Sequence, residues 1–353
     1  MTARLALMGY YGGWNAGDEA ILECLVTELR DVDPDVEIDV LTTRFAPLGY
    51  DTCDRLGVRA VPLRSPGVVR SLLTQRLLIG GGQMITGGGR NTLLCLLCAM
   101  AAVNRLAGRR PLIAFCGAHN IESPWARRLV RVLSRCMTYI ALRDQPSVDA
   151  LTAAGVEPSK LRLSYDVVLG GALSRRQPTD PPPDGGPVLV VGHRSPIRSL
   201  LDIDVLADVV AACAAGSNEV VVLSHDSRQA FDDGLGQQLA KRIGSNGWRF
   251  VPFRSFEEHL ELYRTAAHVI SVRMHPLIIA STLGRPATAL AGSSKVDALT
   301  RRLGMAIIDL ATEPFSLPDV LDSGRPNDVE LPAIRTAIRQ DVDAALASSS
   351  GMP

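Results

Sequence analysis

The chain has 353 residues, of which 46% are hydrophobic and 21% are charged, and its 37 basic residues balance its 37 acidic ones. A net charge of zero excludes the strongly cationic surface needed for sequence-independent nucleic-acid binding, so no nucleic-acid partner is expected. A single hydrophobic core stops growing at roughly 250 to 300 residues, and two domains are therefore predicted. The sequence shows neither a run of about 20 apolar residues nor a signal peptide in residues 1–14, which favours a cytoplasmic protein.

The first half of the chain alternates short apolar strands with helices. Residues 4–9 are a predicted strand, followed by a glycine-containing loop and an amphipathic helix over residues 18–29. Further short, apolar or β-branched segments predict strands at 36–41, 77–79, 112–115, 139–142 and 161–163. This alternation is typical of a parallel sheet that is covered by helices on both faces.

Residues 177–187 (QPTDPPPDGGP) contain five prolines and two glycines and are predicted to be a linker. They separate a domain over residues 1–176 from a domain over 188–330. Strands are predicted in the second domain at 188–191, 219–223, 249–251, 269–272 and 287–290. Residues 331–347 form a predicted closing helix, and 348–353 a frayed tail. The predicted fold is thus α/β, with two Rossmann-like domains whose parallel sheets face a central cleft.

Residues 92–103 (TLLCLLCAMAAV) are apolar on every side of the predicted helix. The favoured interpretation is a fully buried helix, because the run is too short to span a bilayer. The alternative is a contact with a membrane surface or a second subunit, helped by the basic residues Arg105, Arg109 and Arg110.

The seven cysteines and six histidines carry no metal-binding pattern. Cys95 and Cys98 have the spacing of a metal or redox pair, but no second pair exists, and both are expected to be buried small residues. The odd cysteine count, with no export signal, favours reduced thiols. No metal and no bound cofactor are predicted.

Two glycine-rich turns follow predicted strands. Gly12, Gly13, Asn15 and Gly17 surround the first turn, and Asp18 and Glu19 begin the helix after it. Gly80, Gly81 and Gly82 form the second turn. Glycines of this kind let a ligand approach the backbone closely, although an ordinary capped turn would need the same residues. The pattern differs from a dinucleotide-binding fingerprint and lacks the lysine of a phosphate-binding loop.

Cationic side chains follow several predicted strands. Arg273 and His275 come directly after one strand, Lys295 follows the next, and Arg143 follows a strand of the first domain. Separated cations directed at one spot suit a small polyanion, because Arg forks onto carboxylates or phosphates and Lys acts as a point charge. Each also has a simpler explanation: Arg143 could pair with Asp144, His275 could cap a helix, and Lys295 could be solvated.

Taken in order, several segments resemble the polysaccharide pyruvyl transferase family. They cover some 290 residues, and the ordered set is more specific than any single motif. The matching segments are N-A-G-D-E-A-I-L at 15–22, G-G-G at 80–82, A-L-R-D-x-x-S at 141–147 with G-V at 155–156, Asp166, S-H-D at 224–226 with D-D at 232–233, and R-M-H-P-L-x-x-A from 273 through G-R-P at 284–286 to Lys295.

This resemblance implies a GT-B-like fold and a transferase that moves pyruvate from phosphoenolpyruvate onto two hydroxyls of a sugar, giving a cyclic ketal. By similarity with the family, Arg143, His275 and Lys295 would bind phosphoenolpyruvate. Arg273 and Ser294 are further donor-binding candidates, with the domain over 1–176 as the expected acceptor side and the domain over 188–330 as the expected donor side. The acceptor could be lipid-linked or nucleotide-linked, in the assembly of a cell-surface glycan or a glycosylated metabolite. A site at the inner face of the membrane, and an oligomer, are left open.

Ketal formation needs an acid to protonate the enol carbon and a base to accept hydroxyl protons. The candidates are His275, Asp18, Glu19 and Asp144. Residues expected to line the cleft or contact the acceptor are Gly13, Asn15, Gly17, Gly81, Gly82, His119, Arg194, His225 and Asp226. The chain departs from the family at 117–124 (GAHNIESP), where His119 and Glu122 are inserted, so the acceptor contacts there differ.

Two other functions remain open from the sequence. One is a glycosyltransferase of the same fold that uses a nucleotide sugar, although no clear nucleoside-binding segment is visible. The other is a catalytically silent carbohydrate-binding protein.

Overall fold

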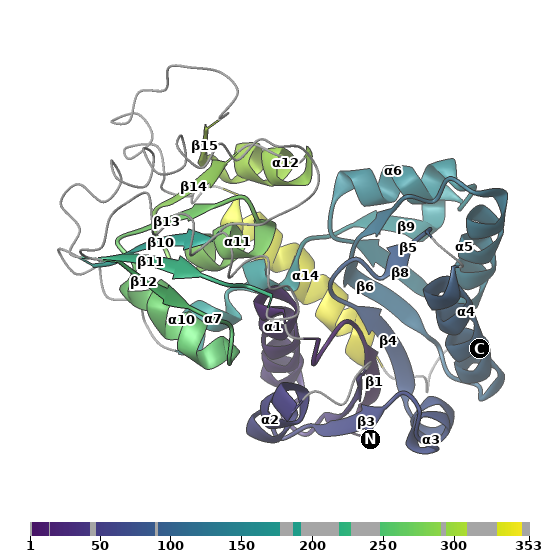
Figure 1. Ribbon diagram of the computed structural model, residues 1–353. Helices are drawn as coiled ribbons and strands as arrows, with labels where there is room; N and C mark the ends of the chain where they lie inside the picture. Colours follow the sequence, from purple (N-terminus) through teal and green to yellow (C-terminus); the bar gives the residue numbers. More distant parts are fainter. Residues whose placement is uncertain are drawn as a thin grey trace. The chain divides into compact units, whose positions relative to one another are not determined.

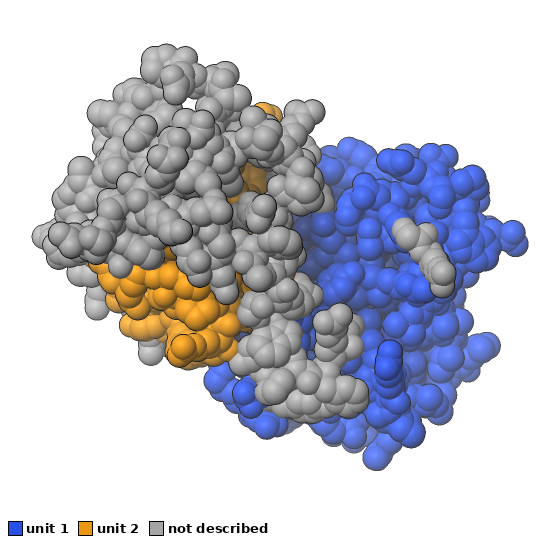
Figure 2. All heavy atoms as spheres, viewed as in Figure 1, with its two compact units in different colours: residues 1–13, 18–170, 333–353 blue, residues 14–17, 171–332 orange. Residues whose placement is uncertain are grey.

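A computed structural model describes residues 2–13, 15–42, 47–88, 91–176, 186–191, 219–226, 248–290, 294–308 and 330–347. The chain forms two compact units (Figure 2). Unit 1 comprises Met1–Gly13, Asp18–Gly170 and Ala333–Pro353, and unit 2 comprises Trp14–Gly17 and Gly171–Pro332.

Unit 1 contains a seven-stranded sheet in the order β3-β2-β1-β4-β6-β8-β9 (Figure 1). Every neighbouring pair is parallel. The central strands are buried on both faces, as in other parallel sheets covered by helices. The strands are β1 (Arg4–Met8), β2 (Glu37–Thr42), β3 (Arg59–Pro62), β4 (Arg76–Gly80), β6 (Leu112–Cys116), β8 (Tyr139–Leu142) and β9 (Leu161–Leu163), and a separate small sheet pairs β5 (Ile85–Thr86) with β7 (Ala118–His119).

The helices of unit 1 lie on both faces of its sheet. The chain runs from β1 outward to β3 and then returns to β4 and continues to β9, so right-handed crossovers put α1 and α2 on one face and α3 to α6 on the other. On the second face α4 packs against both α3 and α5. The helices are α1 (Ala16–Val32), α2 (Pro47–Arg55), α3 (Gly67–Thr74), α4 (Thr92–Leu106), α5 (Pro124–Cys136), α6 (Gln145–Ala153) and α14 (Leu331–Leu346), with 3-10 turns η1 (Pro158–Lys160) and η2 (Val167–Gly170).

Unit 2 contains a six-stranded parallel sheet in the order β12-β11-β10-β13-β14-β15. This order reverses between β10 and β13, as in a Rossmann fold. The strands are β10 (Val188–Val191), β11 (Val220–Leu223), β12 (Trp248–Val251), β13 (His268–Ser271), β14 (Ala287–Leu290) and β15 (Ala306–Ile308). The described helices are α7 (Ala172–Arg176), α10 (Phe256–Thr265), α11 (Met274–Thr282) and α12 (Ser294–Leu303).

The α/β prediction is confirmed, and every strand predicted from the sequence is present. Four strands were missed: β3 (RAVP) and β15 (AII), which lie at the edges of the two main sheets, and the two-residue strands β5 and β7 of the small sheet. RAVP contains Arg and Pro, which interrupt an apolar strand pattern, and the other three segments are only two or three residues long.

The segment that unit 2 takes from the middle of the chain is Gly171–Pro332, and unit 2 also contains Trp14–Gly17. Most of the predicted linker, residues 177–185, and the tail from 348 onward lie outside the described residues. The predicted closing helix is α14, and it belongs to unit 1 from Ala333 onward. There Asp341 accepts hydrogen bonds from Tyr139 Oη, at 2.5 Å, and from Ser164 Oγ, which fixes α14 to the strands β8 and β9.

The prediction of a fully buried helix at 92–103 is wrong. α4 buries one side, including Leu94, Leu97 and Met100, whereas Leu96 is 39% exposed and Leu106 is 87% exposed. Cys95 is exposed and Cys98 is half-buried, so the expectation that both are buried is also wrong. Helical geometry gives the reason: a single covering layer can shield only one side of a helix, however apolar the other side is. No helix among the described residues is both long and apolar enough to cross a bilayer.

The buried side of α4 carries one polar anchor, Asn104. Its Oδ1 accepts a hydrogen bond from Leu77 N at 3.1 Å, and its Nδ2 donates to Leu72 O at 2.6 Å and Gln75 O at 2.8 Å. These bonds join α4 to the end of α3 and the start of β4. They satisfy three backbone groups that would otherwise be buried without partners.

Replacing Asn104 by Ala should therefore lower the free energy of unfolding by about 3 kcal/mol, because three buried backbone groups lose their partner. Urea denaturation followed by circular dichroism measures this. The control is Gln340→Ala, which removes an exposed amide from α14 and should change stability by less than about 0.5 kcal/mol. An Asn104→Ala protein as stable as the control would show that these bonds do not anchor α4.

Candidate functional site

In unit 1 the loops after β1 and β4 meet where the strand order reverses. Ligands of open parallel sheets bind at such a point, outside the carboxyl ends of the strands. Gly81 has φ +77°, and a Cβ there would overlap the side chain of Ile21. A Cβ on Gly82 would lie 3.1 Å from Asp18 Oδ1. This brings together four predicted site residues: Asp18, Glu19, Gly81 and Gly82. The loop after β1 also contains Gly13.

Glu19 supports the loop after β1 from beneath. Its side chain is buried, and Oε1 accepts a hydrogen bond from Gly12 N at 2.8 Å. Burial raises the pKa of Glu19 to about 7, against hydrogen bonds from Gly12 and Thr52 that lower it. Glu19 therefore changes its protonation state near neutral pH while it holds the glycine loop in place.

Tyr11 is a site residue that sequence reasoning missed. Its ring is buried, and its hydroxyl donates to Gly80 O at 2.7 Å, which joins the loops after β1 and β4. Burial raises the pKa of Tyr11 well above its usual value, and the negative charges of Asp18 and Asp166 raise it further. A tyrosine within the loop after the first strand was the only available signal, and it is weak.

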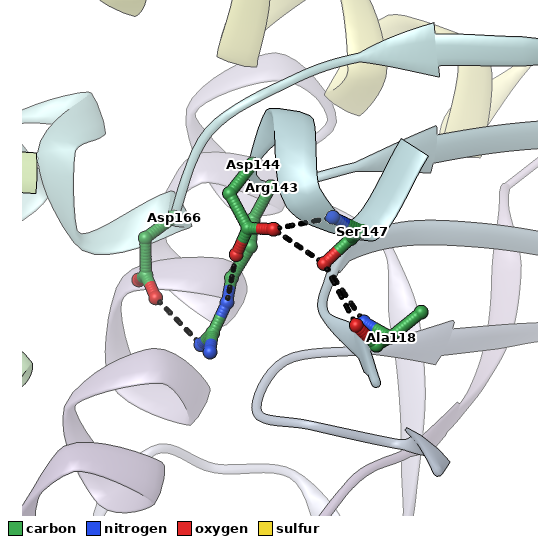
Figure 3. A network of polar contacts seen from close by, with 5 residues as sticks. All are labelled: Ala118, Arg143, Asp144, Ser147 and Asp166. Carbon is green, nitrogen blue, oxygen red and sulfur yellow. Dashed lines mark hydrogen bonds and ion pairs between the residues drawn. The ribbon is translucent and has the colours of Figure 1, made fainter. Parts of the chain in front are cut away.

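Arg143 lies between two carboxylates at the end of β8 (Figure 3). Its Nε is 3.3 Å from Asp144 Oδ2, and its Nη1 is 3.4 Å from Asp166 Oδ2. Asp144 also caps α6, because its Oδ1 accepts from Ser147 N at 2.8 Å, and Ser147 Oγ accepts from Ala118 N at 2.8 Å. The R-D-x-x-S motif thus supplies a buried cation, a helix cap and a link to β7. The ion pair between Arg143 and Asp144, which the sequence suggested as a simpler explanation for Arg143, is present.

The end of β6 next to Arg143 has an unusual backbone. Phe115 has φ +61°, and the pairing of β6 with β8 shifts register between Ile113 and Cys116. A bulky residue with positive φ is rare and often marks a functional site. Burial raises the pKa of Cys116 to about 12, so its thiol remains protonated and is a poor nucleophile.

In unit 2, Arg273 and His275 lie at the start of α11, directly after β13. Gly17 lies against His275, and a Cβ at this position would overlap the imidazole at Nδ1. Lys295 lies in the first turn of α12, after β14, which is the neighbour of β13 in the sheet. The first turns of α11 and α12 therefore follow adjacent strands at one edge of the sheet, and both direct backbone N–H groups and a positive dipole end there.

His225 and Asp226 follow the carboxyl end of β11, at the same edge of the unit 2 sheet. Asp226 forms an isolated bridge with Asn15, and Ala16 N donates to His225 O at 2.9 Å. The His225 ring is buried and its Nε2 is 2.6 Å from Tyr263 Oη. Burial lowers the pKa of His225 well below its usual value, and the nearby His259 and the charge of Arg273 lower it further. His225 is thus a neutral residue that supports the Asn15 loop.

Other predicted site residues are only partly covered by the described structure. Arg194, and the side chains of Ser294 and Lys295, lie outside the described residues. His119 is half-buried in β7, within the segment where the chain departs from the family pattern. Arg143 belongs to unit 1, whereas His275 and Lys295 belong to unit 2, so the convergence of the three on one ligand stays a prediction. Among the described residues no group of three His, Cys, Asp or Glu side chains is placed to hold a metal ion.

The pKa of Glu19 yields a stability prediction. Between pH 4.5 and 7 the folded protein retains a proton on Glu19 that the unfolded chain has lost, so stability should fall as the pH rises through this window. Glu19→Gln should remove about 3 kcal/mol of this pH dependence. Unfolding midpoints at pH 5 and pH 7.5 measure it, with the exposed Glu37→Gln as the control. Equal pH dependence in wild type and Glu19→Gln would contradict the assignment.

Comparison with solved structures supports the architecture. The chain aligns over 99% of its length with all of the UDP-GlcNAc 2-epimerase from Neisseria meningitidis, solved with UDP-GlcNAc, at 13% identity and a TM-score of 0.61. It aligns over 97% of its length with 95% of HepE from Anabaena, solved with UDP-glucose, at 14% identity and a TM-score of 0.55. A glycosyltransferase from Rickettsia africae is similar over 98% of this chain and 94% of its own, at 11% identity and a TM-score of 0.56. These likenesses confirm a GT-B-like fold of two Rossmann-like sheets.

A search of curated protein sequences finds no match. The family model for polysaccharide pyruvyl transferase, in contrast, matches residues 15–294, a span that runs from Asn15 of the first loop to Ser294 at the start of α12. The R-D-x-x-S segment and the Arg273–His275 segment both lie inside it. The chain therefore belongs to the polysaccharide pyruvyl transferase family.

Proposed function

We propose that this transferase moves pyruvate from phosphoenolpyruvate onto two hydroxyls of a sugar, forming a cyclic ketal and releasing phosphate. The observation that carries the proposal is the edge of unit 2, where Arg273 and His275 begin α11 and Lys295 lies in the first turn of α12. Two helix N-termini and three cationic residues on adjacent βα units match a compact trianion. Family membership supports the same reaction.

In the proposed reaction the enol carbon of phosphoenolpyruvate takes up a proton, which gives an oxocarbenium ion at the neighbouring carbon. One sugar hydroxyl attacks that carbon and loses its proton. Phosphate then leaves, the second hydroxyl attacks and loses its proton, and the ring closes. The two hydroxyl protons balance the one gained by the new methyl group and the one carried away on phosphate. No redox change occurs.

We propose two proton carriers from among the four candidates. Asp144 already caps α6 and pairs with Arg143, and Glu19 is buried beneath Gly12. We therefore assign proton transfer to Asp18 and His275, and give Asp144 and Glu19 positioning roles. The acidic residues near Tyr11 suit the acceptor, since sugar hydroxyls donate hydrogen bonds to carboxylates and a phosphate would be repelled by them.

A glycosyltransferase that uses a nucleotide sugar is the second candidate. It is favoured by the structural likeness to HepE and to the epimerase, which were solved with UDP-glucose and UDP-GlcNAc. We propose that either reaction takes place in the cytoplasm, on a sugar carried by a lipid or a nucleotide, with no bound metal or cofactor.

Donor choice tests the proposal directly. We expect phosphate release when the protein is incubated with phosphoenolpyruvate and a panel of sugar acceptors, and an acceptor product heavier by one pyruvate ketal. Release of UDP from UDP-glucose, with no phosphate from phosphoenolpyruvate, would replace the proposal by glycosyl transfer. Binding of acceptors without turnover of either donor would indicate a carbohydrate-binding protein.

Lys295→Ala should weaken phosphoenolpyruvate binding by about 2 to 3 kcal/mol, or roughly 30- to 150-fold in Kd, because a charge-assisted contact is lost. Isothermal titration calorimetry measures the affinity. The chain has only three lysines, and Lys160, which is exposed on η1, provides the matched control, Lys160→Ala. Unchanged affinity in Lys295→Ala would remove this residue from the donor site.

Gly17→Ala should lower turnover by at least about 100-fold, because the new Cβ displaces the imidazole of His275. Gly88→Ala is the control, since a Cβ there meets nothing within 4 Å and should leave turnover nearly unchanged. Phosphate release measures turnover, and thermal denaturation shows whether both variants are folded. Normal turnover in folded Gly17→Ala would show that the position of His275 does not matter for the reaction.

A further inference from the structure

Exposed apolar side chains are concentrated on one layer of unit 1, the helices α3, α4 and α5. Seven large hydrophobic residues are exposed in the described part of the chain, and six of them lie on these helices. Their exposed fractions run from 39% to 87%. The six are Val69, Leu73, Leu96, Leu106, Trp125 and Val132. An apolar patch of this kind on a water-facing helix layer is typical of an interaction surface.

The apolar residues follow helical stripes. On α4, Leu96 and Leu106 are ten residues apart, and the exposed Ala99 lies between them at the spacing of one helix side. On α5, Trp125 and Val132 are seven residues apart and share a side of the helix. Because α4 packs against both α3 and α5, these stripes belong to one continuous layer.

The same layer is strongly basic although the whole chain is neutral. Residues 61–138 contain eleven arginines and a single acidic residue, Glu122. Arg128 and Arg135 alternate with Trp125 and Val132 along the exposed side of α5. The exposed arginines on the three helices are Arg70, Arg105, Arg127, Arg128, Arg131 and Arg135. Within the described residues none of these six lies in salt-bridge distance of an Asp or Glu, so their charge is not neutralised locally.

We propose that this arginine-rich apolar face docks on a membrane surface that contains anionic phospholipids. Arginines can contact lipid phosphates while the apolar side chains between them enter the boundary of the acyl chains. Trp125 has the amphipathic ring that is enriched at such interfaces. This face would attach the enzyme to the surface of the bilayer without crossing it. This inference does not depend on which donor the enzyme uses.

Charge decides between a membrane and a second copy of the chain. In a symmetric dimer each patch meets its own counterpart, so the arginines of one copy would face those of the other without acidic partners. A lipid surface supplies the missing negative charge. The exposed side chains are also mainly aliphatic, which suits acyl chains.

Flotation with vesicles tests the proposal on the full-length protein. We expect binding to phosphatidylcholine vesicles that contain phosphatidylglycerol, weaker binding to phosphatidylcholine alone, and loss of binding at high salt. The triple variant Arg105→Glu, Arg128→Glu, Arg135→Glu should bind anionic vesicles at least about 100-fold more weakly. The matched control is Lys160→Glu, Arg301→Glu, Arg335→Glu, which makes the same change in net charge at exposed positions elsewhere and should bind as wild type.

A second variant separates the apolar contribution from the charge. Trp125→Ser with Leu96→Ser should also weaken vesicle binding while net charge is unchanged. Light scattering should give the same oligomeric state for wild type and for these variants. The proposal is overturned if wild type ignores anionic vesicles, if both triple variants bind alike, or if the serine variant dissociates an oligomer and wild type does not bind vesicles. Thermal denaturation confirms that each variant is folded.

Discussion

Parallel pairing is the constraint on which the rest of this structure depends. When every strand runs the same way, every loop at a strand's carboxyl end lies at the same edge of the sheet. Residues far apart in the sequence therefore lie close together, although no local sequence pattern encodes their proximity. In unit 1 this brings Tyr11, Asp18, Gly81 and Arg143 to one edge, and in unit 2 it brings His225, Arg273 and Lys295 to another.

The two edges differ in charge. In unit 1 the cation Arg143 is held by Asp144 and Asp166, and Asp18 and Glu19 lie nearby, so carboxylates dominate. In unit 2, Arg273 precedes α11 and Lys295 lies in the first turn of α12 together with Asp297, and each helix adds its positive dipole end. We therefore propose the first edge for hydroxyl groups and proton transfer, and the second for an anion. Within the N-A-G-D-E segment, Asn15 and Gly17 belong to unit 2, whereas Asp18 and Glu19 belong to unit 1.

The sequence was sufficient for the periodic parts of the fold. Strands such as 77–79 and 220–223 are apolar and bounded by breakers, so their pattern is local and readable. The positions of Arg273 and His275 followed from the same pattern, because they come directly after a strand. The strands β3 and β15 were not recognised, because RAVP contains Arg and Pro and AII is only three residues long.

Features set by tertiary packing could not be predicted. The exposed side of α4 depends on which layer covers it, and its uniformly apolar sequence gives no sign of that. The role of Tyr11 depends on a hydrogen bond to Gly80, 69 residues away. The positive φ of Phe115 arises where β6 shifts register against β8. None of these leaves a local signature in the residues themselves.

The central claim is that an anionic donor binds at the edge of unit 2. Amide hydrogen exchange, measured with and without phosphoenolpyruvate, tests it most directly. We expect phosphoenolpyruvate to slow exchange in the first turns of α11 and α12, where backbone N–H groups would bind it. Protection there by UDP-glucose, with no effect of phosphoenolpyruvate anywhere in the chain, would contradict it.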